Sequence, residues 1–151
     1  MPKKTQKTAF KLYREGADYQ QIDLKKLRAF LKAQTPLETF EFEEVSKGEH
    51  WISISTPELT NICPFTDYPD FGSVLIEYVP RKKCLELKSL KLYINAFRDI
   101  KIFHEALTEV IFADFLDVVK PRKARIIVDM NVRGNVKTIC KKHYNTVSPS
   151  A

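Results

Sequence analysis

The chain has 151 residues, 44% of them apolar and 29% charged, which is the composition of one ordinary globular domain. It contains no run of about 18 apolar residues, so a membrane-spanning helix is excluded, and its basic start lacks the apolar core of a secretory signal. The three cysteines are widely spaced and form no disulfide framework, which predicts a reducing compartment and therefore the cytoplasm.

The formal net charge of +6 makes nucleic acid and a phosphate-bearing cofactor the two candidate anionic partners. The basic residues are spread along the chain, and many lie near its two ends, where such charge usually belongs to a solvated surface. No recognised nucleic-acid-binding motif accompanies them. We therefore expect no direct contact with nucleic acid, whereas an anionic cofactor remains open.

Residues 1–34 are predicted to be an N-terminal extension, and residues 35–151 the main domain. Leucines at helical spacing within the extension predict a short amphipathic helix over residues 22–33. Pro36 is expected to end that helix, because the residue before a proline disfavours helical backbone.

Apolar and polar residues alternate at positions 40–42 and again at 52–54, which predicts two half-buried strands. Residues 46–49 are the expected turn between them. Residues 56–72 show no periodicity and contain three prolines, so a long loop is predicted there. Because this loop carries aromatic and aliphatic side chains, we expect it to be packed and functional.

An alternating apolar face at residues 74–78 predicts the next strand. After a charged connection, Ser89 is expected to cap a helix that begins at Leu90. Apolar residues at steps of three or four from Phe103 onward predict a second, longer helix, which Pro121 ends.

The chain closes with a second predicted hairpin, in which residues 125–132 alternate, Gly134 and Asn135 form the turn, and residues 136–143 return. The order of strands, two helices and strands predicts an α+β fold, with an antiparallel four-stranded sheet and two helices on one face. Such a sheet has two edges, and closing it into a barrel requires strands from other subunits, so we expect a multimeric barrel.

Cys63 is followed by two carboxylates, Asp67 and Asp70, in the predicted functional loop. A thiolate beside an acid suits covalent catalysis, in which the sulfur attacks an electrophilic carbon and the acid supplies a proton. The alternative is that Cys63 is a small buried apolar residue. A zinc site is a further possibility, but it would require the fold to gather Cys63, His104 and Cys140.

Two further clusters could bind or react with a substrate. Lys88 and Lys91 lie beside a predicted helix start, where backbone N–H groups and ammonium groups attract phosphate, unless they are ordinary solvated lysines. His104 can exchange a proton near neutral pH, and Glu105 can accept two hydrogen bonds from a guanine-type base, unless the two form a simple surface pair. The chain has no glycine-rich phosphate motif, which excludes a standard dinucleotide fold.

Three motifs follow one another in a fixed order: Cys-Pro at residues 63–64 with Asp70 after it, Glu-Leu-Lys-Ser-Leu-Lys-Leu-Tyr at residues 86–93, and Phe-His-Glu at residues 103–105. In these motifs the chain resembles the NADPH-dependent 7-cyano-7-deazaguanine reductases, the nitrile reductases of queuosine biosynthesis, in their short single-domain form. The resemblance covers residues 36–145 and is most specific in the eight-residue motif.

The resemblance implies the tunnelling fold, in which subunits of two strands, two helices and two strands close a barrel. It implies a homo-oligomer, a decamer of two stacked pentamers, with active sites between subunits. It also implies the reaction, which is reduction of the nitrile of 7-cyano-7-deazaguanine to the amine of 7-aminomethyl-7-deazaguanine with NADPH as cofactor.

The same resemblance implies individual roles. Cys63 would add to the nitrile carbon and form a covalent thioimide, and Asp70, protonated in a desolvated site, would donate a proton. The residues implied to border or hold the substrate are Leu85, Glu86, Leu87, His104 and Glu105. Those implied to meet NADPH are Lys88, Ser89, Lys91 and Arg133, and no metal is implied.

Two other functions stay open from the sequence. One is a tunnelling-fold pterin or purine enzyme such as a GTP cyclohydrolase, which would need closely spaced zinc ligands that this sequence does not display. The other is a basic nucleic-acid-binding module, which the net charge alone would allow.

Overall fold

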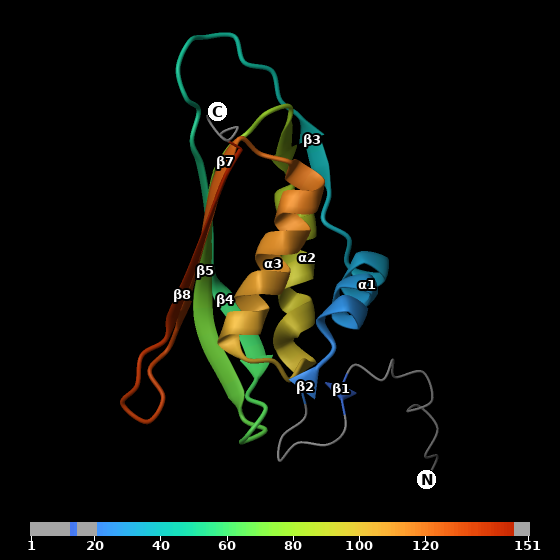
Figure 1. The fold of residues 1–151 in the computed structure, drawn as a ribbon, viewed down its shortest axis with the longest axis vertical. Coiled ribbons are helices and arrows are strands. Elements are labelled where there is room, and N and C mark those ends of the chain that lie inside the picture. The colour runs from blue at the N-terminus through green and yellow to red at the C-terminus, as the bar shows by residue number, and fades with distance from the viewer. Residues whose placement is uncertain (1–12, 15–20, 147–151) are drawn as a thin grey trace, which may run out of the picture.

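Four antiparallel strands form the main sheet of the computed structural model, which describes residues 13–14 and 21–146. In sheet order the strands are β4 (Ile52–Ile62), β5 (Pro69–Val79), β7 (Lys123–Met130) and β8 (Ile139–Asn145). Helices α2 (Leu87–Asn95) and α3 (His104–Val119) lie against one face of this sheet (Figure 1). The predicted α+β fold, with a four-stranded antiparallel sheet and two helices on one face, is confirmed.

The smaller elements surround this layer pair. Helix α1 lies outside α3, a 3-10 turn follows α2, and two short strand pairs form separate two-stranded sheets, β1 with β2 and β3 with β6. Their bounds are β1 (Tyr13–Arg14), β2 (Gln21–Ile22), α1 (Leu24–Gln34), β3 (Thr39–Glu41), β6 (Lys83–Leu85) and η1 (Ala96–Asp99). The predicted helix over residues 22–33 is therefore present as α1, and none of the described helices is long and apolar enough to cross a membrane.

The predicted first hairpin is wrong. Phe40 lies in β3 opposite Cys84 of β6, whereas Ile52 begins β4 and faces Tyr78 of β5. Both segments do contain strands, but Phe40 is 54% exposed, so the buried face predicted for the first of them is wrong. The alternation also carries no information on the partner strand, which the tertiary fold decides.

The predicted loop at residues 56–72 is also wrong over most of its length, because β4 and β5 continue to Ile62 and from Pro69. Pro57 obscured this strand in the sequence. The pairing of β4 with β5 shifts register between Thr56 and Leu59, and a proline is tolerated at such an irregularity because no ladder hydrogen bond is needed there.

Gly72 lets β5 approach β7 closely near the end of the sheet. A Cβ atom on Gly72 would lie 2.5 Å from the backbone oxygen of Asp129 and 2.7 Å from the sulfur of Met130. Both distances are too short for any real side chain, so the crossing requires glycine. The consequence is that the first residues of β5, including Asp70, are held against the β7–β8 hairpin.

The β7–β8 hairpin turns where the sequence predicts. Gly134 and Asn135 have φ angles of 56° and 62°, and the backbones of Arg133 and Val136 exchange two hydrogen bonds of 3.2 and 3.0 Å. Positive φ at both central residues matches the right-handed twist of the flanking strands, and glycine and asparagine adopt it at least cost.

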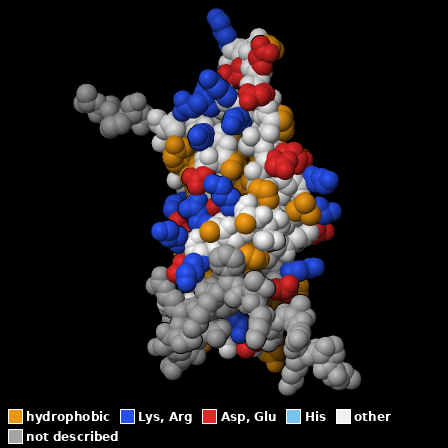
Figure 2. Space-filling model, turned by 90° about the vertical axis from the view of Figure 1, so that its right-hand side faces the viewer, with side chains coloured by type: hydrophobic (Ala, Val, Ile, Leu, Met, Phe, Trp, Pro, Cys, Tyr) orange, Lys and Arg blue, Asp and Glu red, His pale blue; other side chains and the backbone are white. Residues whose placement is uncertain are grey.

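The main core fills the space between the sheet and the helices, with aromatic side chains at its centre: Tyr78, Tyr93, Phe97, Phe112 and Phe115. Leu27 and Leu31 of α1 are fully buried in the same core. The domain boundary at residue 34 stays a prediction, but α1 packs on the domain. On the face that carries α1, basic and acidic side chains are interspersed and apolar ones are scattered (Figure 2).

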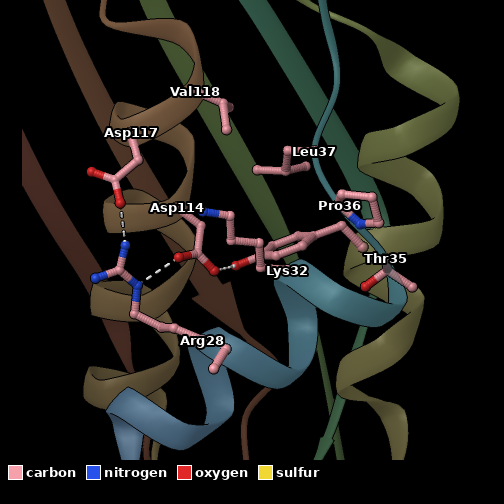
Figure 3. Close-up of a pocket in the computed structure, with 10 residues that line it drawn as sticks. Arg28, Lys32, Thr35, Pro36, Leu37, Asp114, Asp117 and Val118 are labelled. Carbon is pink, nitrogen blue, oxygen red and sulfur yellow. Dashed lines mark hydrogen bonds and ion pairs between the residues drawn. The ribbon is translucent and has the colours of Figure 1, made fainter.

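A partly buried network of ion pairs and a hydrogen bond attaches α1 to α2 and α3 (Figure 3). Arg28 of α1 donates to Asp114 and to Asp117 of α3, each at 2.5 Å, and Tyr93 of α2 donates to Asp114 at 2.7 Å. Burial, together with the Asp114 charge, raises the pKa of Tyr93 well above its usual value, so this hydroxyl stays protonated and can donate.

Replacing Asp114 by alanine is expected to lower the free energy of unfolding by about 2–4 kcal/mol, because the buried Tyr93 hydroxyl then keeps only the long 3.5 Å contact to the Val110 oxygen. Asp117→Ala is the matched control, since the Asp117 side chain is 70% exposed and such pairs contribute about 0–1 kcal/mol. Chemical denaturation of both variants measures the difference. Equal losses in the two variants would show that the Tyr93–Asp114 bond contributes nothing particular.

Candidate active site

Cys63 lies directly after β4, in the short connection to β5. Its backbone N–H donates to the Tyr68 oxygen at 2.9 Å, and its own oxygen accepts from the Asp67 N–H at 3.1 Å. The connection is also tied to the segment before α3, because Lys101 forms a 2.7 Å ion pair with Asp67 and the Ile62 N–H donates to the oxygen of Ile100 at 2.9 Å. The thiol is therefore carried by a short, hydrogen-bonded turn.

The surroundings of the Cys63 sulfur favour its thiolate. Burial opposes ionisation, but hydrogen bonds from the Thr66 hydroxyl and from the backbone N–H groups of Thr66 and Phe65 outweigh it, even against the nearby Asp70 charge. The pKa of the Cys63 thiol is consequently lowered from its ordinary value. Successive N–H groups in a turn form an anion-binding nest, and a half-buried thiolate is both reactive and accessible.

Replacing Thr66 by valine is expected to raise the pKa of Cys63, because the thiolate loses its hydroxyl donor while the volume of the side chain is kept. Alkylation of Cys63 by iodoacetamide should then slow by about tenfold near neutral pH, and the pH profile of its rate should move to higher pH. Thr60→Val, on the neighbouring part of β4, is the control. An unchanged profile in Thr66→Val would contradict the assigned donor.

Asp70 is buried beside the thiol, with 6% of its surface exposed, and each of its oxygens has a partner. Oδ1 accepts from Nη1 of Arg133 at 2.7 Å, and Oδ2 lies 3.0 Å from Nε2 of His104. The same Nη1 atom of Arg133 donates to the oxygen of Pro69 at 2.5 Å. The structure thus brings together four residues that the sequence singled out, from three separate parts of the chain: Cys63, Asp70, His104 and Arg133.

Glu105 follows His104 in the first turn of α3, and its side chain is exposed. Phe103, which precedes them, contacts the exposed ring of Phe65 edge-on, with 5.7 Å between ring centroids. An exposed carboxylate and an aromatic pair therefore flank the thiol and imidazole, an arrangement that can hold a flat, hydrogen-bonding ring.

Cys140 does not join Cys63 and His104 in a metal site. The Cys140 side chain is hydrogen-bonded to the Thr108 side chain, and burial raises the pKa of the Cys140 thiol. Among residues 13–14 and 21–146, no three His, Cys, Asp or Glu side chains lie close enough together to hold a metal ion. The zinc alternative considered from the sequence therefore gains no support from the arrangement of these side chains.

The second predicted cluster, residues 86–93, begins at the N-terminal end of α2, which is the end of the helix away from the Cys63 turn. This helix is roughly 13 Å long, begins beside β3, and leads through η1 to residues 100–102, next to the end of β4 (Figure 1). Within one chain, the length of α2 and η1 therefore separates residues 85–88 from Cys63 and His104, and Lys91 lies midway along α2.

Within that cluster, the predicted start of α2 is wrong. The helix begins at Leu87, and Glu86 is its N-cap, accepting from the backbone N–H groups of Lys88 and Ser89 at 2.7 Å each. The pKa of Glu86 is lowered by these two bonds. The sequence reading assumed free N–H groups for a phosphate, but the Glu86 carboxylate already uses two of them.

The predicted cofactor residues differ in what they can still bind. Lys88 and Lys91 are exposed and form no ion pair with any described residue, so their ammonium groups fit a phosphate-bearing cofactor. Ser89 is buried, with its hydroxyl donating to the Glu86 oxygen and accepting from the Glu38 N–H. Arg133 uses Nη1 on Asp70 and Pro69, which leaves its Nε and Nη2 groups for a phosphate.

The predicted substrate residues of this cluster also differ. Leu85 is 2% exposed and belongs to the core, while Leu87 is 58% exposed. Leu87, rather than Leu85, therefore presents a side chain that a bound molecule could contact.

Two contributors near the thiol were missed in the sequence. Asn61 was read as a loop residue because the loop prediction hid the end of β4, whereas Thr66 does lie in the connection between β4 and β5, and no sequence signal marked it as a donor to Cys63. Once β4 is extended, Leu59 and Asn61 occupy alternate positions on its buried face, and a polar residue on a buried face is a signal for a site.

The fold and the site define a class of protein: an α+β domain of the tunnelling type with a thiol, a buried carboxylate and an imidazole at the end of its sheet. The crystal structure of an apo archaeosine synthase described as QueF-Like has this fold, with a TM-score of 0.61 and 22% identity, covering 68% of this chain and 100% of that one.

Sequence relatives give the family. The family model described as QueF-like protein matches residues 69–148. A protein of Gloeothece citriformis is 44% identical over 71% of this chain and 78% of its own length, and one of Chloroherpeton thalassium is 42% identical over 72% and 92%. Both relatives are named NADPH-dependent 7-cyano-7-deazaguanine reductase. The chain belongs to the QueF-like family.

Proposed function

We propose that this protein is an NADPH-dependent oxidoreductase that reduces the nitrile of 7-cyano-7-deazaguanine to the primary amine of 7-aminomethyl-7-deazaguanine, a step of queuosine tRNA-modification biosynthesis. The observation that carries the proposal is a Cys63 thiol with a lowered pKa beside the buried Asp70–His104 pair. The names of the relatives supply the substrate and the cofactor. A reducing compartment, the cytoplasm, suits a catalytic thiol.

The first step is covalent. The Cys63 thiolate adds to the nitrile carbon, a C–S bond forms, and one π bond of the nitrile breaks toward nitrogen. Asp70 gives its proton to that nitrogen, so the product is a neutral thioimide on Cys63. A nitrile is a weak electrophile, and the reaction therefore needs both the thiolate and a nearby acid.

NADPH, when bound, supplies a hydride for each of the two reductions that turn the nitrile carbon into a CH₂–NH₂ carbon. Between them the C–S bond breaks and the electron pair returns to the Cys63 sulfur. His104, 3.0 Å from Asp70, is placed to return a proton to that carboxylate. Arg133 holds the other oxygen of Asp70 in place.

Recognition of the base uses the exposed start of α3. Glu105 can accept two hydrogen bonds from the pyrimidine edge of a deazaguanine, and the Phe65–Phe103 pair offers an apolar surface to its ring. His104 is next to Glu105 in the chain, and its Nε2 atom is 3.0 Å from Asp70. A base held by Glu105 would therefore have its nitrile directed toward Asp70 and Cys63.

A complete site requires more than one subunit. Lys88, in the first turn of α2, and Lys91, midway along it, fit phosphate, but the rest of α2 and η1 separates them from Cys63, so we assign them to the site of a neighbouring copy. The two edges of the sheet, β4 and β8, are the surfaces through which copies can close a barrel. The proposed assembly is a homo-oligomer of two stacked pentamers.

Turnover with the two candidate substrates tests the function. With 7-cyano-7-deazaguanine, the protein should oxidise two NADPH for every amine formed, as followed by NADPH absorbance and product mass. The competing function, a GTP cyclohydrolase, predicts instead that GTP is converted without NADPH. Conversion of GTP, with no nitrile reduction over a full pH range, would overturn the proposal.

Mixing two inactive variants tests the shared site. Co-assembled Cys63→Ala and Lys91→Glu chains should recover part of the activity that each lacks alone, because some sites receive Cys63 from a Lys91→Glu chain and Lys91 from a Cys63→Ala chain. The control mixes Cys63→Ala with Asp70→Asn, which lie in one subunit's cluster and should not complement. Complementation in neither mixture would count against a site built by two chains.

A further inference from the structure

Asn61 is a fully buried polar residue for which the proposed chemistry has no use. It lies on β4 two positions before Cys63, and it is paired directly with Asp70 of β5. Residues directly opposite each other in an antiparallel pair have side chains on the same face, so Asn61 and Asp70 are buried neighbours.

Only one end of the Asn61 amide has a partner. Its Nδ2 group donates to the oxygen of Ile102 at 2.9 Å, which ties the end of β4 to the segment before His104. Its Oδ1 atom is the single buried side-chain polar atom without a hydrogen bond among the described residues. A buried acceptor without a donor destabilises the fold, so we expect the Oδ1 atom to accept a hydrogen bond in one of the protonation states of the site.

Asp70 becomes such a donor only when it is protonated. As a carboxylate, Asp70 accepts a hydrogen bond from Arg133 of the β7–β8 hairpin and lies within hydrogen-bond distance of His104 of α3. Cys63 is the ionisable group that faces it from the end of β4. The protonated acid carries one O–H, which needs an acceptor; the Arg133 guanidinium has none to offer, and Nε2 of His104 can accept only when that nitrogen carries no proton.

We propose that Asn61 is a positioning residue whose Oδ1 atom accepts the hydrogen bond of protonated Asp70 and so stabilises the acid form that donates to the substrate. The proposal rests on the proposed function, in which Asp70 is the proton donor. Through Nδ2 the same amide also holds the Cys63 strand and the His104 segment together, so one side chain connects all three groups.

The test is the protonation of Asp70 itself, measured by carboxyl ¹³C NMR on protein labelled at aspartate, with Asp70→Asn to assign the resonance. In Asn61→Leu, which keeps the volume but removes the acceptor, the titration midpoint of Asp70 should fall by about one pH unit, so about tenfold less acid form remains at a given pH. If Asn61→Leu does not fold, Asn61→Ser replaces it, since its hydroxyl can donate to the carboxylate and predicts a shift in the same direction.

Thr108→Val is the matched control. Thr108 is 4% exposed and donates to the His104 oxygen at 2.8 Å, so its loss loosens the same helix start without removing an acceptor from Asp70. Its midpoint should stay near that of the parent. A midpoint unchanged in the folded Asn61 variant, or shifted equally in Thr108→Val, overturns the proposal. Because the measurement needs no turnover, its failure is distinct from a failure of the proposed reductase function.

Discussion

Cys63→Ala is expected to abolish nitrile reduction, with a loss of at least about 10³-fold in kcat/KM, because no other group can form the covalent bond to the nitrile carbon. Intact-protein mass spectrometry makes the bond visible. Wild-type protein incubated with 7-cyano-7-deazaguanine and no NADPH should gain the full mass of the substrate, because addition expels no atoms. Cys63→Ala should gain nothing.

Cys140→Ala is the matched control for this experiment, since Cys140 is also half-buried and unbonded to another cysteine. It should keep both the adduct and the activity. The raised pKa of Cys140 makes it the poorer nucleophile of the two thiols, whereas that of Cys63 is lowered. An adduct that survives in Cys63→Ala, or no adduct in the wild type at any pH, would contradict the assigned nucleophile.

Asp70→Asn is expected to separate two properties of the site. It removes the proton donor, so kcat should fall by about 10²–10⁴-fold and the pH dependence that belongs to the acid should vanish. It also removes a negative charge that raises the pKa of Cys63, so that pKa should fall further and Cys63 should be alkylated faster at low pH. A slower reductase with a more reactive thiol is not what a misfolded protein would show.

Asp67→Asn is the comparison for Asp70→Asn. Asp67 lies nearer to Cys63 in the sequence, but its side chain is 66% exposed and pairs with Lys101. Its replacement should change kcat by less than about threefold, because an exposed ion pair contributes about 0–1 kcal/mol. A pH–rate profile for Asp70→Asn that matches the parent's would reject Asp70 as the acid.

Much of the fold could be predicted because its signals are local. The apolar spacing of α3, the amphipathic pattern of α1 and the Gly134–Asn135 turn each depend on neighbours a few residues apart, and all three are present. The loop prediction at residues 56–72 failed because Pro57 and an irregular pairing interrupt the alternation of β4, which no local rule restores.

The site was predictable only in its chemistry. The residue types and spacing around Cys63, Asp70 and His104 indicated a thiol, an acid and a base, whatever their arrangement. The role of Glu86 as the N-cap of α2 was not expected, although a carboxylate before a helix is a known signal, because the start of that helix was placed three residues late.

The sequence by itself determined which groups are available: a cysteine followed by two aspartates, and a histidine at the start of an apolar helix. Only the tertiary structure decided that Asp70 contacts Arg133 and His104, and that Asn61 lies opposite Asp70 with its Oδ1 atom lacking a hydrogen-bond donor. The physical reason is the separation along the sequence of the residues that interact. Turns and helices follow from contacts within a few residues, whereas these partners are tens of residues apart and meet through strand register and helix packing.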